Sequence, residues 1–304
     1  MPRPLRWIPE DGALVEVTCR TLHGRFLLRP SRKLNEIIIG ILARAKRMYE
    51  VELCAFVFIS NHYHLLVWVP DAKQLAGFMN YFNSNLAREA GRLVGWREKF
   101  WARRYRAIVI SNEEIEQVER LKYLLSNGTK EGLVIRPQDW PGLHCIRALL
   151  EGEELAGYWF DRTQEYAARS RGEEFEPLRY ATPEILTLDP LPCWRGLTAS
   201  QIRTRVSDLV AQIEMESAIA RQGSEPLGVE AVLSQDPHSR PLQMKKSPAP
   251  RFHAATREAL QVLYKGYSSF VKAFRDAAER LRSGDLTVRF PSGSFPPGLP
   301  FVRA

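Results

Sequence analysis

The chain has 304 residues, 45% of them hydrophobic, and carries a formal net charge of +8 with a sequence pI of about 9.4. This length and hydrophobic content exclude a disordered polyelectrolyte and leave room for one large or two ordinary folded domains. The basic balance favours a polyanionic partner such as nucleic acid, although a basic pI alone also serves solubility.

The cysteines and the apolar runs indicate a protein of the cytoplasm. The longest apolar region, 51–69, is interrupted by polar residues at 60–62, which predicts no transmembrane helix and no membrane partner. The cysteines are scattered without a C-x-x-C pair, which excludes a zinc ribbon and fits a reducing compartment. They are Cys19, Cys54, Cys145 and Cys193.

Residue patterns in the first 110 positions predict the order strand, helix, strand, strand, helix, strand. The expected strands alternate or are rich in β-branched and aromatic residues, and the expected helices repeat apolar residues every three or four positions. This order is the split βαβ, ferredoxin-like arrangement of an α+β fold, with helices on one face of an antiparallel sheet and the other face left for a site. The strands are 13–19, 51–59, 62–69 and 105–110, and the helices are 31–50 and 72–92.

A further helix is expected to begin at Ser111, because Ser111-x-x-Glu114 matches a capping box. Its apolar stripe is predicted to be Ile115, Val118, Leu121 and Leu125, and Gly128 is expected to end it. The opposite, polar side carries Glu116, Arg120, Tyr123 and Asn127. A helical Tyr usually lies on the apolar side, so Tyr123, with Asn127 one turn beyond it, is a candidate functional residue.

His62 and His64 form a second candidate site. If 62–69 is a strand, alternation places both side chains on one face, where two imidazoles can share a divalent metal. With six His in the chain, an H-x-H pair can also arise by chance. Tyr63 alternates to the opposite face.

Three ordered motifs together resemble the HUH single-tyrosine transposases, in particular the REP-associated tyrosine transposases of the IS200-like family. These are N-H-x-H-L-L-V at 61–67, F-W-x-x-R-Y at 100–105, and Tyr123-x-x-x-Asn127 followed by G-L-V at 132–134. The resemblance covers roughly residues 13–145. The chain departs from the family pattern at Ser60 and Gly128, where the family usually has Pro, and at Tyr63, where an aliphatic residue is common.

The resemblance implies a metal-dependent endonuclease and strand transferase acting on single-stranded DNA folded into an imperfect palindromic hairpin. Tyr123 would attack the phosphodiester, leaving a 5′-phosphotyrosine and a free 3′-OH that allow rejoining without ATP. His62, His64 and the metal-capable Asn127 would hold a divalent ion, Mg²⁺ or Mn²⁺. Two imidazole ligands suit Mn²⁺ better.

The densest basic and aromatic stretch predicts the DNA contacts. Lys and Arg neutralise phosphates, and aromatic rings stack on unpaired bases. For Trp101 and the neighbouring Tyr105, packing beside the sheet is an equally good interpretation. The predicted DNA-binding residues are Lys99, Trp101, Arg103, Arg104 and Arg106.

The expected division of the chain is a catalytic domain at 1–148 and a mainly helical, basic region at 149–304. Helices are expected at 151–166, 198–223 and 252–282. Residues 238–304 hold twelve Lys/Arg and four Asp/Glu, so this region could contact DNA, pack on the catalytic domain, or do both.

Two other functions are compatible with parts of the sequence. One is a catalytically inactive, domesticated transposase that acts as a DNA-binding regulator. The other is a zinc hydrolase using His62 and His64, which would need a third strong ligand. For the transposase, we expect a monomer or homodimer in the cytoplasm, associated with the nucleoid.

Overall fold

The structure is a computed structural model that describes residues 5–172, 176, 178–242 and 250–298. Within these residues, a five-stranded sheet with the order β2-β3-β1-β4-β7 forms the centre. Its first four strands are antiparallel and confirm the ferredoxin-like prediction. They are β1 (Ala13–Arg20), β2 (Glu52–Ile59), β3 (His62–Val69) and β4 (Arg106–Ile110).

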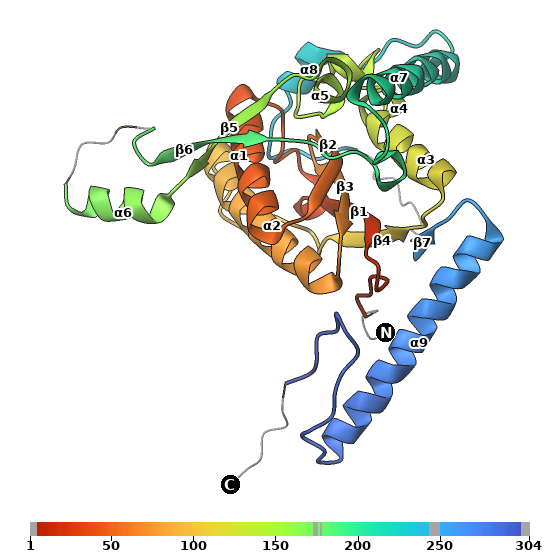
Figure 1. The fold of residues 1–304 in the computed structure, drawn as a ribbon. Coiled ribbons are helices and arrows are strands. Elements are labelled where there is room, and N and C mark those ends of the chain that lie inside the picture. The colour runs from red at the N-terminus through yellow and green to blue at the C-terminus, as the bar shows by residue number, and fades with distance from the viewer. Residues whose placement is uncertain (1–4, 173–175, 177, 243–249, 299–304) are drawn as a thin grey trace.

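The fifth strand comes from the far end of the chain. β7 (Phe252–His253) pairs with β4 in parallel, with Val109 opposite Phe252 and Ile110 opposite His253. These residues were expected to begin a helix at 252. That boundary was wrong: the helix, α9 (Arg257–Arg282), begins after Thr256, whose side chain accepts a hydrogen bond from the Ala259 amide. Figure 1 shows α9 running away from β7 along one side of the molecule.

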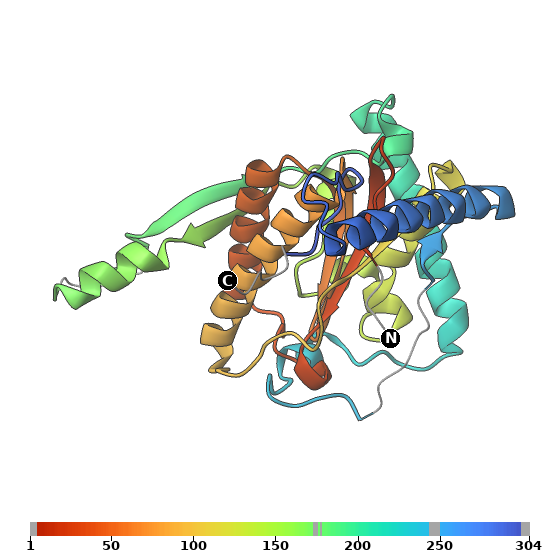
Figure 2. The same ribbon diagram turned by 90° about the horizontal axis from the view of Figure 1, so that it is seen from below.

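Two long helices cover one face of the sheet, as Figure 2 shows with the sheet nearly edge-on. They are α1 (Arg32–Tyr49), capped by Ser31 as predicted, and α2 (Ala72–Val94), capped by Asp71. Tyr63 points to this side and is fully buried between Phe58 and Phe82. The even-numbered neighbours of Tyr63 on β3 therefore face the opposite side.

The opposite face is covered by α3 (Glu114–Leu125), which packs on β2 and β3. Behind α3 lies α7 (Ala199–Arg221), whose Thr198–Gln201 capping box agrees with the predicted start. Ion pairs between Lys122 and Glu216, and between Arg205 and Glu114, join α3 to α7. The shorter helices on this side are α4 (Asn127–Lys130), α5 (Ile146–Glu151) and α8 (Val229–Leu233).

The expected helix at 151–166 was wrong over most of its length, and residues 162–166 are helical as part of a later helix. Residues Leu155–Phe160 form β5, which pairs with β6 (Ala181–Leu186), and only the segment between them contains a helix, α6 (Arg162–Ser170). This hairpin projects from the body and packs on α1 (Figure 1). Short 3-10 helices at Leu22–Gly24, Pro137–Asp139 and Pro192–Trp194 complete the described elements.

No helix in the described part of the chain is both long enough and apolar enough to cross a membrane. All four cysteines are free thiols.

Candidate active site

The two histidines lie at the start of β3, directly after the turn at 60–61. Their ring centroids are 5.2 Å apart, on the sheet face away from α1 and α2. His62 and His64 therefore lie on the same face of the sheet, as strand alternation predicted. His64 is buried, and His62 is partly exposed at the edge of the site.

Each imidazole uses its Nδ1 for a contact with the protein. His62 Nδ1 lies 2.7 Å from Asn61 Oδ1, and His64 Nδ1 lies 3.0 Å from Glu16 Oε1. Metal-binding histidines typically donate one ring N–H to a carboxylate or carbonyl, which fixes the tautomer and presents the other nitrogen. Both rings are thus oriented with Nε2 available to a ligand.

The pKa of His62 lies well below its ordinary value. Burial of the ring is the main cause, and the nearby His64, Arg20 and Lys130 add to it. A lowered pKa keeps the imidazole neutral, which is the form that binds a metal.

Glu16, on β1, is a site residue that the motifs did not reveal. Its side chain is buried, and its second oxygen lies 3.1 Å from His253 Nε2. Burial would raise the pKa of this carboxyl, but the contacts with His253 and His64 more than offset it and hold the pKa well below its ordinary value. Glu16 is therefore an anion between two imidazoles.

Helix α3 turns its polar side toward this face, so the predicted apolar stripe was wrong in part. Ile115 is 70% exposed, whereas Glu116 and Gln117 are buried along with Leu121, Leu124 and Leu125. The helix also begins at Glu114 with no side-chain cap, because Ser111 Oγ donates to Glu113 instead. Gln117 is satisfied by the carbonyl of Ser111 and the amide of Cys193.

Tyr123 meets the histidines as the motif predicts. Its ring centroid is 5.7 Å from that of His64, in an edge-on arrangement. Lys130 Nζ lies 3.7 Å from the Tyr123 ring centre, and the Arg120 guanidinium lies 5.4 Å from it. Arg120 is in turn paired with Glu116 at 3.0 Å. Two cationic side chains therefore contact the ring of Tyr123.

Asn127 is buried one turn beyond Tyr123, at the start of α4. Its amide nitrogen donates to the carbonyls of Tyr123 and Leu124, 3.0 Å away in each case. These bonds satisfy carbonyls at the end of α3 and fix the orientation of the amide.

The donor set fits a divalent ion held by a few protein ligands. Imidazole nitrogens such as those of His62 and His64 suit Mn²⁺, and an amide oxygen such as that of Asn127 is a type of ligand that Mn²⁺ and Mg²⁺ accept. Among the described residues, no group of three His, Cys, Asp or Glu side chains could hold a metal ion. This does not favour the zinc hydrolase, which needs a third strong ligand.

Two arginines flank the histidines on the same sheet face. In the strand register, Arg20 is opposite His62, and Thr18 lies between His64 and Arg106. Directly opposed residues of antiparallel strands share a face. Arg106 was expected to contact DNA, and Arg20 was not singled out. Both are exposed.

The other predicted DNA-binding residues divide into two groups. Lys99, Arg103 and Arg104 are exposed. Trp101 packs against Tyr63 and Phe100, and its indole N–H donates to the Asn83 carbonyl at 3.0 Å, as the packing interpretation expects.

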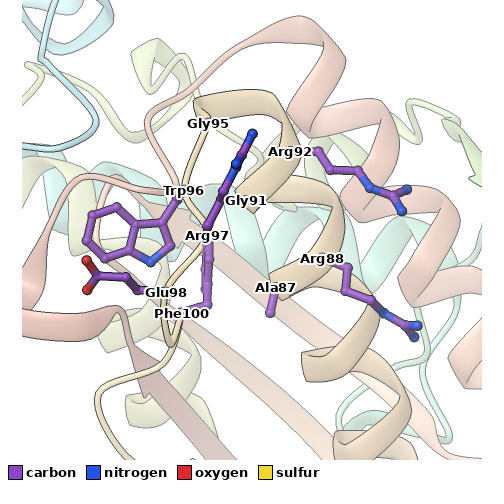
Figure 3. Close-up of a pocket in the computed structure, with 9 residues that line it drawn as sticks. All are labelled: Ala87, Arg88, Gly91, Arg92, Gly95, Trp96, Arg97, Glu98 and Phe100. Atoms are coloured by element: carbon purple, nitrogen blue, oxygen red, sulfur yellow. The ribbon is translucent and has the colours of Figure 1, made fainter.

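A basic pocket lies at the end of α2, apart from the histidines. Figure 3 shows its lining, which includes Arg88, Arg92, Arg97 and Trp96 and none of the residues around Tyr123. It adjoins Phe100, so it lies next to the 99–106 stretch.

The missed site residues differ in how visible they are in the sequence. Glu16 is a charged residue in the middle of an apolar strand, on the face opposite Val15 and Val17, and this pattern could have identified it. Lys130 follows Asn127 by less than a helical turn. His253 has no neighbouring motif, and only the pairing of β7 with β4 brings it to the site.

Residues 27–124 match the model of the family described as "Transposase IS200 like". The matched segment is about a third of the chain and contains His62, His64 and Tyr123. Asn127 lies three positions beyond the matched segment.

Among solved structures, one similar chain is described as a REP-associated tyrosine transposase bound to a REP hairpin. It is 18% identical, with a TM-score of 0.42, over 50% of this chain and 87% of that one. Another is described as a transposase of Deinococcus radiodurans R1, at 14% identity and a TM-score of 0.28, over 40% of this chain and 95% of that one. A search of curated proteins found no match.

Proposed function

We propose that this protein cleaves single-stranded DNA beside a palindromic hairpin and transfers the strand through a 5′-phosphotyrosine on Tyr123. The observation that carries the proposal is the approach of Tyr123 to His64, with Lys130 over the phenol ring. A nucleophile, a pair of metal-capable imidazoles and a cation meet on one sheet face, on elements distant in the sequence.

The reaction uses the phenol oxygen of Tyr123. This oxygen forms a bond to phosphorus while the bond from phosphorus to the 3′ oxygen breaks. The phenol proton passes to water, and the 3′ oxygen takes up a proton from water. The free 3′-OH of a second strand reverses the exchange, so the phosphodiester is conserved.

The protein groups have distinct tasks in this scheme. His62, His64 and Asn127 would hold the divalent ion, Mn²⁺ or Mg²⁺. When bound, the ion would withdraw charge from the scissile phosphate. Asn61 and Glu16 would orient the imidazoles, and Lys130 and Arg120 would place positive charge beside the attacking group. Arg20 and Arg106 would neutralise flanking phosphates.

The DNA would follow the exposed cations at 99–106, and we expect the protein to act as a monomer or homodimer at the nucleoid. Because Trp101 packs on the core, we expect its ring to hold the 99–106 segment in place and not to contact DNA. The matched segment at 27–124 ends before the second half of the chain, and this half is expected to add affinity.

The test is cleavage of a hairpin oligonucleotide by the full chain with Mn²⁺. Replacing His62 and His64 by Ala should abolish cleavage, while circular dichroism and DNA binding stay as in the wild type. Undiminished cleavage by the double variant in the presence of chelator rejects the metal mechanism. Tight binding without cleavage by the wild type would favour the inactive regulator.

A further inference from the structure

His253 stands where the C-terminal half of the chain meets the site. It lies in β7, beyond the segment matched to the transposase family, and its side chain is only 12% exposed. Its partner in the sheet register is Ile110, so it shares a face with Arg106 and Ile108 of β4. This is the face that carries the histidine pair.

The imidazole of His253 lies between two carboxylates. Its Nε2 is 3.1 Å from Glu16 Oε2, and its Nδ1 is 4.0 Å from Glu116 Oε1. The other oxygen of Glu16 holds His64 Nδ1, and Glu116 pairs with Arg120 beside Tyr123. His253 thus connects the strand that carries the histidine pair to the helix that carries the nucleophile.

The backbone around His253 is held independently of these contacts. The Ser111 amide donates to the His253 carbonyl at 2.8 Å. The Phe252 ring packs edge-on against Trp7 and Tyr264. Three residues beyond His253, the Thr256 hydroxyl donates to Glu113 Oε1 at 2.6 Å. The position of His253 is therefore set by the docked segment.

We propose that His253 is a positioning residue for the transposase site, contributed by the C-terminal half. By engaging one oxygen of the buried Glu16 carboxylate, it keeps the other oxygen on His64 Nδ1 and so holds His64 Nε2 toward the metal. Without His253, one oxygen of the buried Glu16 side chain loses its 3.1 Å contact and the carboxyl group is free to turn. The inference rests on the proposed function, because it takes His64 as a metal ligand.

The experiment is a titration of the full-length protein with Mn²⁺, with free Mn²⁺ followed by electron paramagnetic resonance. Outer-shell partners of metal ligands typically contribute about 10- to 100-fold in affinity. We expect His253→Ala to weaken Mn²⁺ binding by about tenfold or more. His253→Gln can place an amide N–H where Nε2 stands and should restore most of the affinity, whereas the shorter His253→Asn should not.

Thr256→Ala is the matched control, because it weakens the docked segment and leaves the contact with Glu16 in place. It should lower the melting temperature while keeping the Mn²⁺ affinity of the wild type. Unchanged affinity in both His253→Ala and His253→Asn would overturn the inference. Equal losses of Mn²⁺ affinity in His253→Gln and Thr256→Ala would also overturn it, because weaker packing of the segment that carries His253 would then explain the effect.

This titration tests the metal site and the role of His253 separately. If replacing His62 and His64 by Ala leaves Mn²⁺ binding intact, the metal site of the proposed function is wrong and the inference falls with it. If that double variant loses Mn²⁺ and the His253 variants do not, only the role of His253 is wrong. If His253→Ala does not fold, the Mn²⁺ affinities of His253→Gln and His253→Asn are compared, and equal affinities overturn the role of His253.

Discussion

Lys130 places its ammonium group 3.7 Å from the centre of the Tyr123 ring, while its own side chain is exposed to solvent. Removing its charge should slow formation of the phosphotyrosine. A preorganised donor in a closed site is typically worth 10²–10³ in rate, and exposure reduces this, so we expect about tenfold for Lys130→Met. The measurement is the rate of adduct formation in a single turnover.

Lys122→Met is the control for this variant. Lys122 is on the same helix as Tyr123 but pairs with Glu216. Lys122→Met should leave the rate of adduct formation unchanged, and Lys130→Arg should retain most of the wild-type rate. A Lys130→Met enzyme as fast as the wild type would show that this cation does not act on the phenol.

The sequence predicted the placement of candidate residues whose relation is local. His62 and His64 share a face because strand side chains alternate, and Tyr123 stands out because it is on the polar side of a helix. The sequence could not predict that Glu16 Oε2 would meet His253, since this depends on a two-residue strand pairing across most of the chain.

Helix α3 shows why its buried side was misjudged. An apolar stripe was expected to face the core, yet the sheet face beneath α3 carries the charged Glu16 and His253. A polar helix side therefore packs inward, and Ile115 is left exposed. A helix that crosses a polar sheet face need not bury its most apolar side.

The hairpin of β5 and β6 was missed for a different reason. Strand pairing between Leu155–Phe160 and Ala181–Leu186 depends on residues far apart, and the second strand contains Pro183. Proline is tolerated in edge strands, and this sheet has only two strands.

Close backbone packing holds that hairpin on α1. A Cβ atom on Gly157 would lie 2.1 Å from the Glu36 carbonyl oxygen, so a side chain there forces the hairpin away. We expect Gly157→Ala to lower the free energy of unfolding by about 1–3 kcal/mol, measured by urea denaturation. Gly196→Ala is the control, because no atom lies within 4 Å of its added Cβ. Equal stabilities of the two variants would contradict the packing.

At the scale of the whole molecule, helix α9 of the C-terminal basic region buries some of its apolar side chains and leaves basic side chains exposed. Leu263, Ala277 and Leu281 of α9 are buried, while Lys265, Lys272 and Arg275 face solvent. Both interpretations of this region, packing and DNA contact, can therefore hold on different sides of one helix.

Replacing Lys265, Lys272 and Arg275 together by Gln tests the DNA contact without removing β7. Each phosphate contact with single-stranded DNA contributes about 0.7 to the slope of log affinity against log salt. We expect weaker binding and a slope smaller by up to about 2 in a fluorescence anisotropy titration. A triple variant that exchanges Lys and Arg should keep the slope. If the slope does not change when the three cations are replaced by Gln, these residues do not contact phosphate and α9 serves only in packing.

The central claim is that Tyr123 is the nucleophile, and the covalent product tests it most directly. The wild type is incubated with a single-stranded hairpin substrate and Mn²⁺, then digested, and the nucleotide-bearing peptide is mapped by mass spectrometry. We expect an adduct on Tyr123 that is absent in Tyr123→Phe, a variant that retains DNA binding because only one oxygen is lost. An adduct on any other Tyr, or full cleavage by the Phe variant, would contradict it.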